Sequence, residues 1–163
     1  MTNETQDARY RIAPAGSADV ADIVRLFTEY ESHIGIDLSY QDFASEVSTL
    51  PGKYAPPPGQ LLIARDAHHD AIGCVALRRL DTRCCEMKRL FVSPAGRGLG
   101  LGRALACAIV DEAKRLGYAE IRLDTLPSMQ AAIGLYKELG FGVVDPYYAT
   151  ALPGTIFMAR ILA

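Results

Sequence analysis

A cluster of glycines beside two arginines is the part of the sequence best suited to bind a ligand. The stretch "VSPAGRGLGLGRAL" carries glycine at positions 96, 98, 100 and 102 and leads directly into a helical pattern. A glycine inside a helix costs roughly 1 kcal/mol relative to alanine, so this placement needs a reason. Glycines at a helix start let a ligand approach the unpaired backbone N–H groups of the first turn, where the helix dipole favours an anion. Because Arg97 and Arg103 can add charge-assisted hydrogen bonds, the stretch predicts a phosphate site.

Two common phosphate motifs do not match this stretch. The P-loop requires a Gly-Lys pair, which is missing from this turn, so an ordinary nucleotide triphosphatase is disfavoured. The dinucleotide fingerprint G-x-G-x-x-G fails in every frame, because its sixth place falls on Leu101, Arg103 or Leu105. An NAD(P)-dependent enzyme is therefore disfavoured as well.

The glycine stretch lies between a predicted strand and a predicted helix. Hydrophobic periodicity and turn residues predict strands over residues 8–15, 60–66, 71–80, 84–92, 119–126, 141–145 and 154–162. They predict helices over residues 17–35, from 39 onward, over 102–117 and over 128–140. The expected order is β-α-α-β-β-β-α-β-α-β-β, an α/β fold with a mixed sheet, and the glycine stretch is the strand-to-helix turn of a right-handed βαβ unit.

Several residues are expected to begin or end these helices. Ser17 or Asp19 is expected to cap the first helix and Gly35 to end it, while Ser39 starts a "SYQD" capping box and Ser128 caps the last helix.

Length, composition and charge limit the class of protein. The chain has 163 residues, half of them hydrophobic and 22% charged, which predicts one globular domain over residues 1–163. A net charge of -2 gives no general electrostatic attraction to nucleic acid. No leader pattern and no apolar run of ~20 residues occurs, so we expect no membrane association and a cytoplasmic location. The four cysteines and three histidines lack zinc-type spacing, so we expect reduced thiols and no metal.

The spacing R-x-x-G-x-G, carried by Arg97, Gly100 and Gly102, resembles the pyrophosphate-binding signature of the GNAT superfamily of acyl-CoA-dependent N-acyltransferases. The segments "EMKRLFVSP" before it and "LYKELGF" after it also look like this family at their expected places. The resemblance covers most of the chain and is to small single-domain members of unassigned substrate. It implies a GNAT-like fold with splayed central parallel strands. It also implies transfer of an acetyl group from acetyl-CoA to a primary amine of a small molecule or peptide, by direct attack in a ternary complex.

The resemblance implies how acetyl-CoA would lie. Its pantetheine arm would occupy the gap between the splayed strands and pair with the backbone of Leu90, Phe91 and Val92, which could equally be plain sheet core. Its pyrophosphate would lie on the turn formed by Arg97, Gly98, Leu99, Gly100, Leu101, Gly102 and Arg103.

The resemblance also implies two catalytic residues. Glu86 lies eleven residues before Arg97, at the offset of the general-base glutamate of histone-type members, although an exposed strand glutamate paired with Lys88 or Arg89 fits the sequence too. Tyr136 matches the family tyrosine that protonates the departing thiolate, although it could be a half-buried helix residue. Met129 stands where many members have an asparagine that contacts the cofactor, so no polar role is expected of it.

The acceptor amine is expected opposite the cofactor, near Tyr30, Glu31, Tyr54 and Tyr147. Four acidic residues lie in the same region: Glu29, Glu31, Asp37 and Asp42. If they surround the entrance to the acceptor site, they would favour a cationic amine as the substrate. They could instead form an ordinary solvated helix face. Two further points stay open. The protein could be a non-catalytic acyl-CoA-binding sensor, and it could form the homodimer that is common in the family.

Overall fold

The computed structural model describes residues 5–7, 9–35, 38, 42–150 and 152–162. Eight strands form one sheet in the order β1-β2-β3-β4-β5-β6-β8-β7. The strands are β1 (Thr5–Asp7), β2 (Tyr10–Pro14), β3 (Gln60–Asp66), β4 (Ala71–Arg79), β5 (Cys84–Val92), β6 (Glu120–Thr125), β7 (Gly142–Val144) and β8 (Ile156–Ile161). The helices are α1 (Val20–Ile34), α2 (Phe43–Ser48), α3 (Leu101–Arg115) and α4 (Gln130–Glu138).

The expected mixed α/β fold and the expected order of elements are confirmed, with one addition. β1 forms a short antiparallel hairpin with β2 in front of the first expected strand. Three polar residues, Thr5 to Asp7, make up β1, and such a segment carries no hydrophobic alternation from which a strand could be predicted.

The two central strands β5 and β6 run parallel and separate after a short stretch of pairing. Pairing joins Cys84 to Glu120 and ends where Glu86 faces Arg122, although β5 continues for six residues to Val92. On its other edge β5 stays paired with β4 as far as Val92. A register shift interrupts that pairing, and Arg89 within it has a φ of 60°. Such a bulge bends a strand, which accounts for the expected splay.

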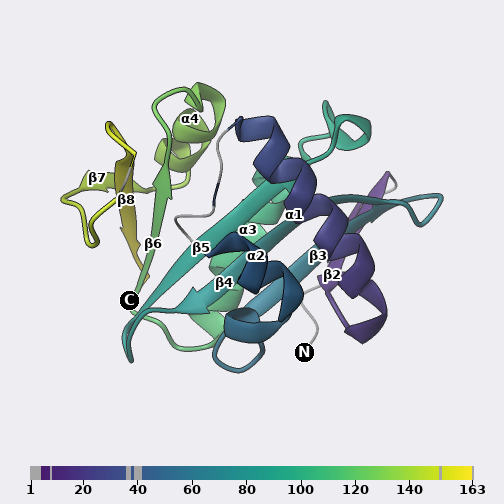
Figure 1. Cartoon of the computed structure of the whole chain (residues 1–163), viewed down its shortest axis with the longest axis horizontal. Coiled ribbons are helices and arrows are strands. Elements are labelled where there is room, and N and C mark those ends of the chain that lie inside the picture. Colours follow the sequence, from purple (N-terminus) through teal and green to yellow (C-terminus); the bar gives the residue numbers. More distant parts are fainter. Residues whose placement is uncertain (1–4, 8, 36–37, 39–41, 151, 163) are drawn as a thin grey trace.

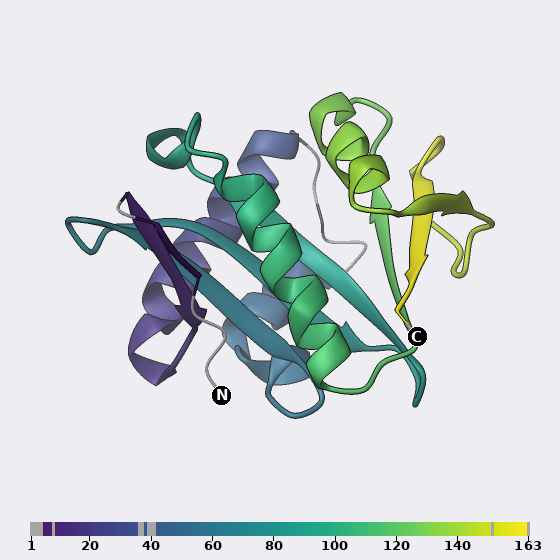
Figure 2. The ribbon, with the colours of Figure 1, turned by 180° about the vertical axis from the view of Figure 1, so that it is seen from behind.

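Helices cover the two faces of the sheet separately. α1 and α2 lie across one face, where Ile23 and Phe27 pack in the same core cluster as Ala76 of β4 (Figure 1). α3 crosses the opposite face, where Leu105 and Ile109 pack among residues of β3 to β6 (Figure 2). α4 lies beside β6 and contributes to the α3-side core. The splay between β5 and β6 therefore lies between two packed layers.

The N-terminal caps of two helices differ from the sequence expectation. α2 begins at Phe43, and its N-cap Asp42 has a φ of 56° and makes no side-chain capping hydrogen bond; the expected start at Ser39 lies outside the described residues. α4 begins after Met129 and not at a Ser128 cap. Gly35 does end α1, in the left-handed conformation with a φ of 68° that favours glycine.

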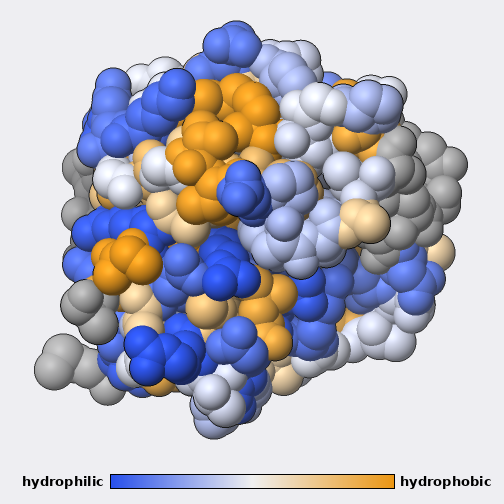
Figure 3. All heavy atoms as spheres, turned by 90° about the vertical axis from the view of Figure 1, so that its left-hand side faces the viewer, coloured by the Kyte–Doolittle hydropathy of each residue, from blue (hydrophilic) through white to orange (hydrophobic). Residues whose placement is uncertain are grey.

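The end of the molecule formed by α4, β7 and β8 exposes apolar side chains between hydrophilic ones (Figure 3). Val143 of β7 and Ile161 of β8 are 65% and 68% exposed, and β7 is an edge strand. A helix with the length and hydropathy to cross a bilayer is not found in the described part of the chain.

Candidate active site

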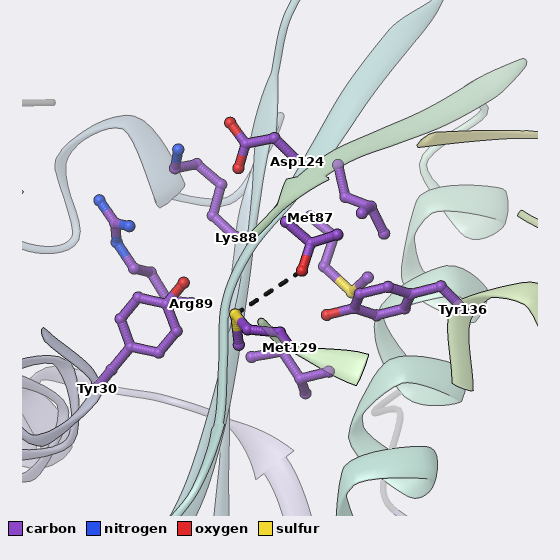
Figure 4. A pocket seen from close by; sticks show the side chains of 10 residues that line it. Tyr30, Met87, Lys88, Arg89, Asp124, Met129 and Tyr136 are labelled. Carbon is purple, nitrogen blue, oxygen red and sulfur yellow. Dashed lines mark hydrogen bonds between the residues drawn. The ribbon is translucent and has the colours of Figure 1, made fainter. Parts of the chain in front are cut away.

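A pocket lies where β5 and β6 separate (Figure 4). It is lined by Tyr30, Met87, Lys88, Arg89, Leu90, Leu123, Asp124, Thr125, Met129 and Tyr136. These residues come from α1, β5, β6 and the start and middle of α4, so the splay brings together segments that are far apart in the sequence. The pocket therefore occupies the gap in which the resemblance places the pantetheine arm.

Strand alternation divides this pocket into two sides. Met87 of β5 and Leu123 of β6 belong to the core cluster on the α3 face, together with Tyr136. Their neighbours Lys88 and Asp124 point to the opposite face, because successive side chains of a strand alternate. Figure 4 shows the Lys88 ammonium and the Asp124 carboxylate facing each other, with the Tyr136 hydroxyl elsewhere in the same pocket. After the roles that the family resemblance implies for Glu86 and Tyr136, we call the face of Lys88 and Asp124 the acceptor side and the face of Tyr136 the donor side.

Glu86 is a buried carboxylate beside the acceptor side, only 1% exposed. Its Oε1 accepts a hydrogen bond from Arg78 Nε at 2.8 Å and lies 3.8 Å from Lys88 Nζ. Its Oε2 accepts a hydrogen bond from the Tyr147 hydroxyl at 2.5 Å. Burial alone would raise the pKa of Glu86, but the charges of Lys88 and Arg78 and these hydrogen bonds hold it below its usual value. Glu86 is therefore ionised at neutral pH, with both oxygens engaged.

The segment between β7 and β8 places two adjacent tyrosines over the two strands. Tyr147 reaches Glu86 on β5, and Tyr148 donates a hydrogen bond to Asp124 Oδ2 on β6. Both rings pack edge-to-face against Phe157 of β8, with centroids 5.1 and 5.0 Å away. One loop thus contacts a carboxylate on each side of the splay.

A second buried ion pair fixes the far wall of the pocket. Arg89 donates two hydrogen bonds to Glu46 of α2, at 2.8 Å from Nε and 3.1 Å from a terminal nitrogen. The Arg89 guanidinium also lies against the rings of Tyr30 and Phe43, 5.7 and 5.3 Å from their centroids. Lys53 Nζ is 3.1 Å from the same Glu46 carboxylate. These contacts connect α1 and α2 to the bulge of β5.

Tyr136 lines the donor side from α4 and is 7% exposed. Burial raises the pKa of its phenol, so the hydroxyl is protonated at neutral pH. Met129, at the expected asparagine position, lines the pocket as well, and its sulfur lies 3.8 Å from the Thr125 hydroxyl. A thioether accepts hydrogen bonds only weakly and donates none. The expectation of no polar role for Met129 stays a prediction.

Two glycines leave open space on the surface of the turn that follows β5. Gly98 and Gly100 have φ values of 81° and 73°, and a Cβ on either would meet no atom within 4 Å. Gly100 is the N-cap of α3 and brings no capping side chain, and the first backbone bond of the helix runs from Ala104 N to Gly100 O at 3.2 Å. The N–H groups before Ala104 in the first turn therefore lack intrahelical acceptors and are available to an anion.

The other residues of the turn make different contacts. Leu101 is 1% exposed and packs in the core, so any contact it makes with a phosphate comes from its backbone. Leu99 packs against the same core, while Arg97 lies 3.5 Å from the Nδ1 atom of His33. Arg103 forms an exposed ion pair with Glu138 of α4.

Leu90, Phe91 and Val92 lie on the stretch of β5 that has left β6. Phe91 and Val92 pair with β4, so one edge of their backbone is used and the edge toward the splay faces away from that pairing. The Phe91 side chain is buried against Tyr30. Phe91 therefore has its side chain in the core and a backbone edge that β4 does not use.

The structure brings only some of the expected acceptor residues together. Tyr30 lines the pocket and Tyr147 contacts Glu86. Glu31 instead accepts a hydrogen bond from the Leu38 backbone at 3.0 Å. The structure does not place Tyr54 at the pocket, because its side chain is 0% exposed and packs edge-to-face on Phe27.

The acidic residues expected near the acceptor do not line the pocket where the structure describes them. Glu29 is paired with Arg25 at 3.0 Å, and neither Glu29 nor Asp42 is among the described lining residues. Asp37 lies outside the described residues. The preference for a cationic amine therefore stays a prediction.

Three charged residues of this site were not predicted as site residues: Asp124, Arg78 and Lys88, of which Lys88 was considered only as an ion-pair partner of Glu86. Lys88 follows Glu86 by two residues on β5, and Asp124 follows Arg122 by two on β6. Charged residues at alternate positions of two strands that are otherwise core are the signal that could have identified Lys88 and Asp124. Arg78 lies on β4, and its role depends on its cross-strand contact with Glu86.

No cysteine is among the described residues that line the pocket. Cys74, Cys84, Cys85 and Cys107 are free thiols, as expected. Across the described ranges, no group of three or more potential metal ligands was found.

The comparisons with known proteins agree with this geometry. The model of the acetyltransferase (GNAT) family matches residues 20–141. An N-acetyltransferase of Schizosaccharomyces pombe described as uncharacterised is 42% identical over 141 residues, 86% of each chain. A GNAT acetyltransferase structure from Staphylococcus aureus superposes with a TM-score of 0.79 at 21% identity and covers 94% of this chain and 99% of its own. A Salmonella typhimurium structure, described as an acetyltransferase with its cofactor acetyl-CoA, has a TM-score of 0.70 at 22% identity and covers 95% of each chain.

A mixed sheet with a pocket between splayed parallel strands and a glycine turn at a helix N-terminus defines an acyltransferase fold. The chain belongs to the GNAT acetyltransferase family and is accordingly an acyltransferase.

Proposed function

We propose that this protein transfers an acetyl group from acetyl-CoA to the primary amine of a small molecule or peptide, by direct attack within a ternary complex. The observation that carries the proposal is the pocket in the splay, with the Tyr136 phenol on one side and the Asp124 carboxylate on the other, and with Glu86 3.8 Å from the lining residue Lys88. Donor and acceptor can enter such a pocket from opposite faces of the sheet. No covalent intermediate on the protein is then required.

The glycine turn and β5 fit acetyl-CoA as the acyl-donor substrate. Because the Cβ positions of Gly98 and Gly100 are open, the pyrophosphate can approach the N–H groups of the first turn of α3. Arg97 and Arg103 lie in the same turn and can add charge-assisted hydrogen bonds. The backbone of Leu90, Phe91 and Val92 offers the amide partners that the pantetheine arm requires.

The proton of the attacking amine passes to Glu86 in this proposal. Because Arg78 and Tyr147 occupy its two oxygens, Glu86 acts through an intervening group, either water or the Tyr147 hydroxyl that it already binds. On the donor side, the Tyr136 phenol donates its proton to the departing thiolate. Its neutral form is favoured by burial, which suits a proton donor.

Release of free thiol from acetyl-CoA over a panel of primary amines tests this function. We expect Glu86→Gln to lower kcat by roughly a hundredfold or more and Tyr136→Phe to lower it by at least tenfold. Tyr118→Phe is the matched control, because the buried Tyr118 hydroxyl donates to Pro58 O, away from the pocket, and its loss leaves kcat unchanged.

Two results would replace the proposal. Acetyl-CoA binding without amine-dependent thiol release in the unmodified protein would establish the alternative, a non-catalytic acyl-CoA sensor. Ligand-dependent thermal stabilisation by NADH and none by acetyl-CoA would remove acetyl-CoA altogether, since only a bound ligand raises stability. Whether the protein forms a homodimer stays open, and the cytoplasmic location stays a prediction.

A further inference from the structure

A second hydroxyl group lies on the donor side of the pocket, in addition to the Tyr136 phenol. Thr125 is the last residue of β6, lines the pocket and is 6% exposed. Leu123, two residues before it, belongs to the core cluster on the α3 face, so strand alternation places the Thr125 side chain on the donor side as well. Tyr136 and Thr125 therefore supply the donor-side hydroxyls among the described lining residues.

The Thr125 hydroxyl has a poor hydrogen-bond acceptor. It lies 3.8 Å from the Met129 sulfur, and the dashed line in Figure 4 joins these two atoms. A thioether accepts hydrogen bonds only weakly, whereas an O–H···O bond shortens to about 2.5–3.0 Å. Because a buried hydroxyl is more stable with a strong acceptor, an oxygen atom that enters the pocket would replace the thioether as the partner of Thr125.

The turn between β6 and α4 holds this hydroxyl in place. Thr125 pairs with Ile156 of β8. The Met129 N–H donates to the Leu126 carbonyl oxygen at 3.0 Å, and the Met129 carbonyl oxygen accepts from Ile133 N at 3.0 Å. The β-branched side chain of threonine also has restricted rotamers. A hydrogen-bond donor that is already positioned stabilises developing negative charge without the cost of reorganisation.

The space that the two hydroxyls border is small. The pocket measures about 30 Å³, roughly the room of two water molecules. Figure 4 shows the Tyr136 hydroxyl pointing into the pocket on the side of Met129, the partner of Thr125. A thioester brings two atoms that gain negative charge during acyl transfer, the carbonyl oxygen and the sulfur. The donor side therefore offers one hydroxyl for each of these atoms.

We propose that Thr125 is a further catalytic residue, whose hydroxyl donates a hydrogen bond to the thioester carbonyl oxygen of acetyl-CoA. The inference rests on the proposed acetyl transfer, in which Tyr136 acts on the sulfur. When the amine nitrogen bonds to the carbonyl carbon, the carbonyl π electron pair moves to the oxygen and the hydrogen bond from Thr125 strengthens. When this pair returns, the C–S bond breaks, and the sulfur leaves with its electron pair and takes the Tyr136 proton. The Tyr136 oxygen regains a proton from solvent, and Thr125 keeps its own proton throughout.

Thiol release by Thr125→Val tests the kinetic part of this inference. Valine keeps the β-branched shape and removes only the hydroxyl. We expect kcat to fall at least tenfold, the effect of losing one such donor, and Thr125→Ser to restore most of it. Because this hydroxyl does not titrate, the fall should be the same at every pH. Thr28→Val is the matched control and should leave kcat unchanged, because the Thr28 hydroxyl donates to the Val24 carbonyl oxygen within α1 at 2.8 Å.

Infrared spectroscopy tests the contact itself, with bound acetyl-CoA that is isotopically labelled at the thioester carbonyl carbon. A hydrogen bond lowers the stretching frequency of a carbonyl group, so we expect the band of bound acetyl-CoA to lie below that of the free molecule. In Thr125→Val the band should move back toward the free value. In Tyr136→Phe and in Thr28→Val it should stay at the wild-type position. A role of Thr125 in packing alone would not move this band.

The outcomes separate this inference from the proposed function. An unchanged band in Thr125→Val overturns the inference, whether or not kcat falls, and leaves acetyl transfer intact. A band that moves only in Tyr136→Phe overturns it as well. If Thr125→Val moves the band but no amine releases thiol in the unmodified protein, the contact is supported and acetyl transfer fails. If acetyl-CoA does not bind, both fail. Thermal unfolding shows whether each variant is folded, and Thr125→Ala gives the same two measurements if the valine variant is not.

Discussion

The Tyr147 hydroxyl donates a hydrogen bond of 2.5 Å to Glu86 Oε2, across 61 positions of the sequence. The next residue, Tyr148, donates to Asp124 on the neighbouring strand. The loop between β7 and β8 is therefore attached to both carboxylates of the acceptor side. It contacts the proposed proton acceptor and the acceptor side of the pocket together.

Removal of the Tyr147 hydroxyl should change the pH dependence of the reaction. The hydrogen bond is one of the interactions that hold the pKa of Glu86 below its usual value, so Tyr147→Phe raises that pKa. Because the proposed reaction needs ionised Glu86, the acid limb of kcat/KM should move to higher pH. A pH–rate profile with a saturating acyl donor measures this.

Tyr148→Phe is the control for this shift. It removes a hydroxyl from the same loop, but from Asp124, so the acid limb should stay in place. An acid limb that is the same in wild type and Tyr147→Phe would show that Glu86 does not set it. A large loss of kcat/KM at every pH in Tyr147→Phe alone would assign the Tyr147 hydroxyl as the intervening group.

The fold could be predicted from the sequence because its signals are local. Alternating or continuous apolar runs identified the strands, and Gly35 identified the end of α1. The glycine turn could also be predicted, because a positive φ and the close approach of a ligand to the backbone both require glycine at Gly98 and Gly100. Gly96 meets another need, because a Cβ there would lie 3.0 Å from the Ile72 carbonyl oxygen.

The polar contacts of the site could not be predicted, because they depend on strand register and on a distant loop. Glu86 lies opposite Arg122 because of the register in which β5 and β6 pair, and their pairing ends there. Which of several tyrosines reaches the pocket depends on how the loops fold back. Tyr147 reaches Glu86 and Tyr54 is buried in the core, although both looked suitable in the sequence.

The buried pair between Glu46 and Arg89 should be important for stability. Glu46→Gln leaves the Arg89 guanidinium buried without its counter-charge, so we expect a loss of about 3–5 kcal/mol in the free energy of unfolding. Chemical denaturation at neutral pH measures it. Glu138→Gln is the control, because its pair with Arg103 is exposed and contributes about 1 kcal/mol at most.

The same pair predicts a pH dependence of stability. Burial alone would raise the pKa of Glu46, but Arg89 and Lys53 hold it below its usual value of 4.5. The stabilisation is therefore fully present above pH 4.5 and is lost as the pH falls through the lower folded-state pKa. The difference in unfolding free energy between wild type and Glu46→Gln should shrink over that acid range. A difference that stays constant from pH 7 down into that range would contradict this account of the pair.

Gly102→Ala should raise stability and weaken acetyl-CoA binding at the same time. Gly102 lies in the first turn of α3 without a positive φ, and a Cβ there would meet only Val92 Cγ2, at 3.9 Å. Alanine is therefore tolerated and should add about 0.5–1 kcal/mol to the free energy of unfolding. The same methyl group narrows the approach to the N–H groups proposed to bind pyrophosphate, so titration calorimetry should give a higher Kd for acetyl-CoA.

Gly134→Ala in α4 is the control for this prediction. A Cβ there meets nothing within 4 Å, so the substitution should raise stability similarly and leave the Kd unchanged. Equal Kd values for the two variants would mean that the phosphates do not bind at this turn.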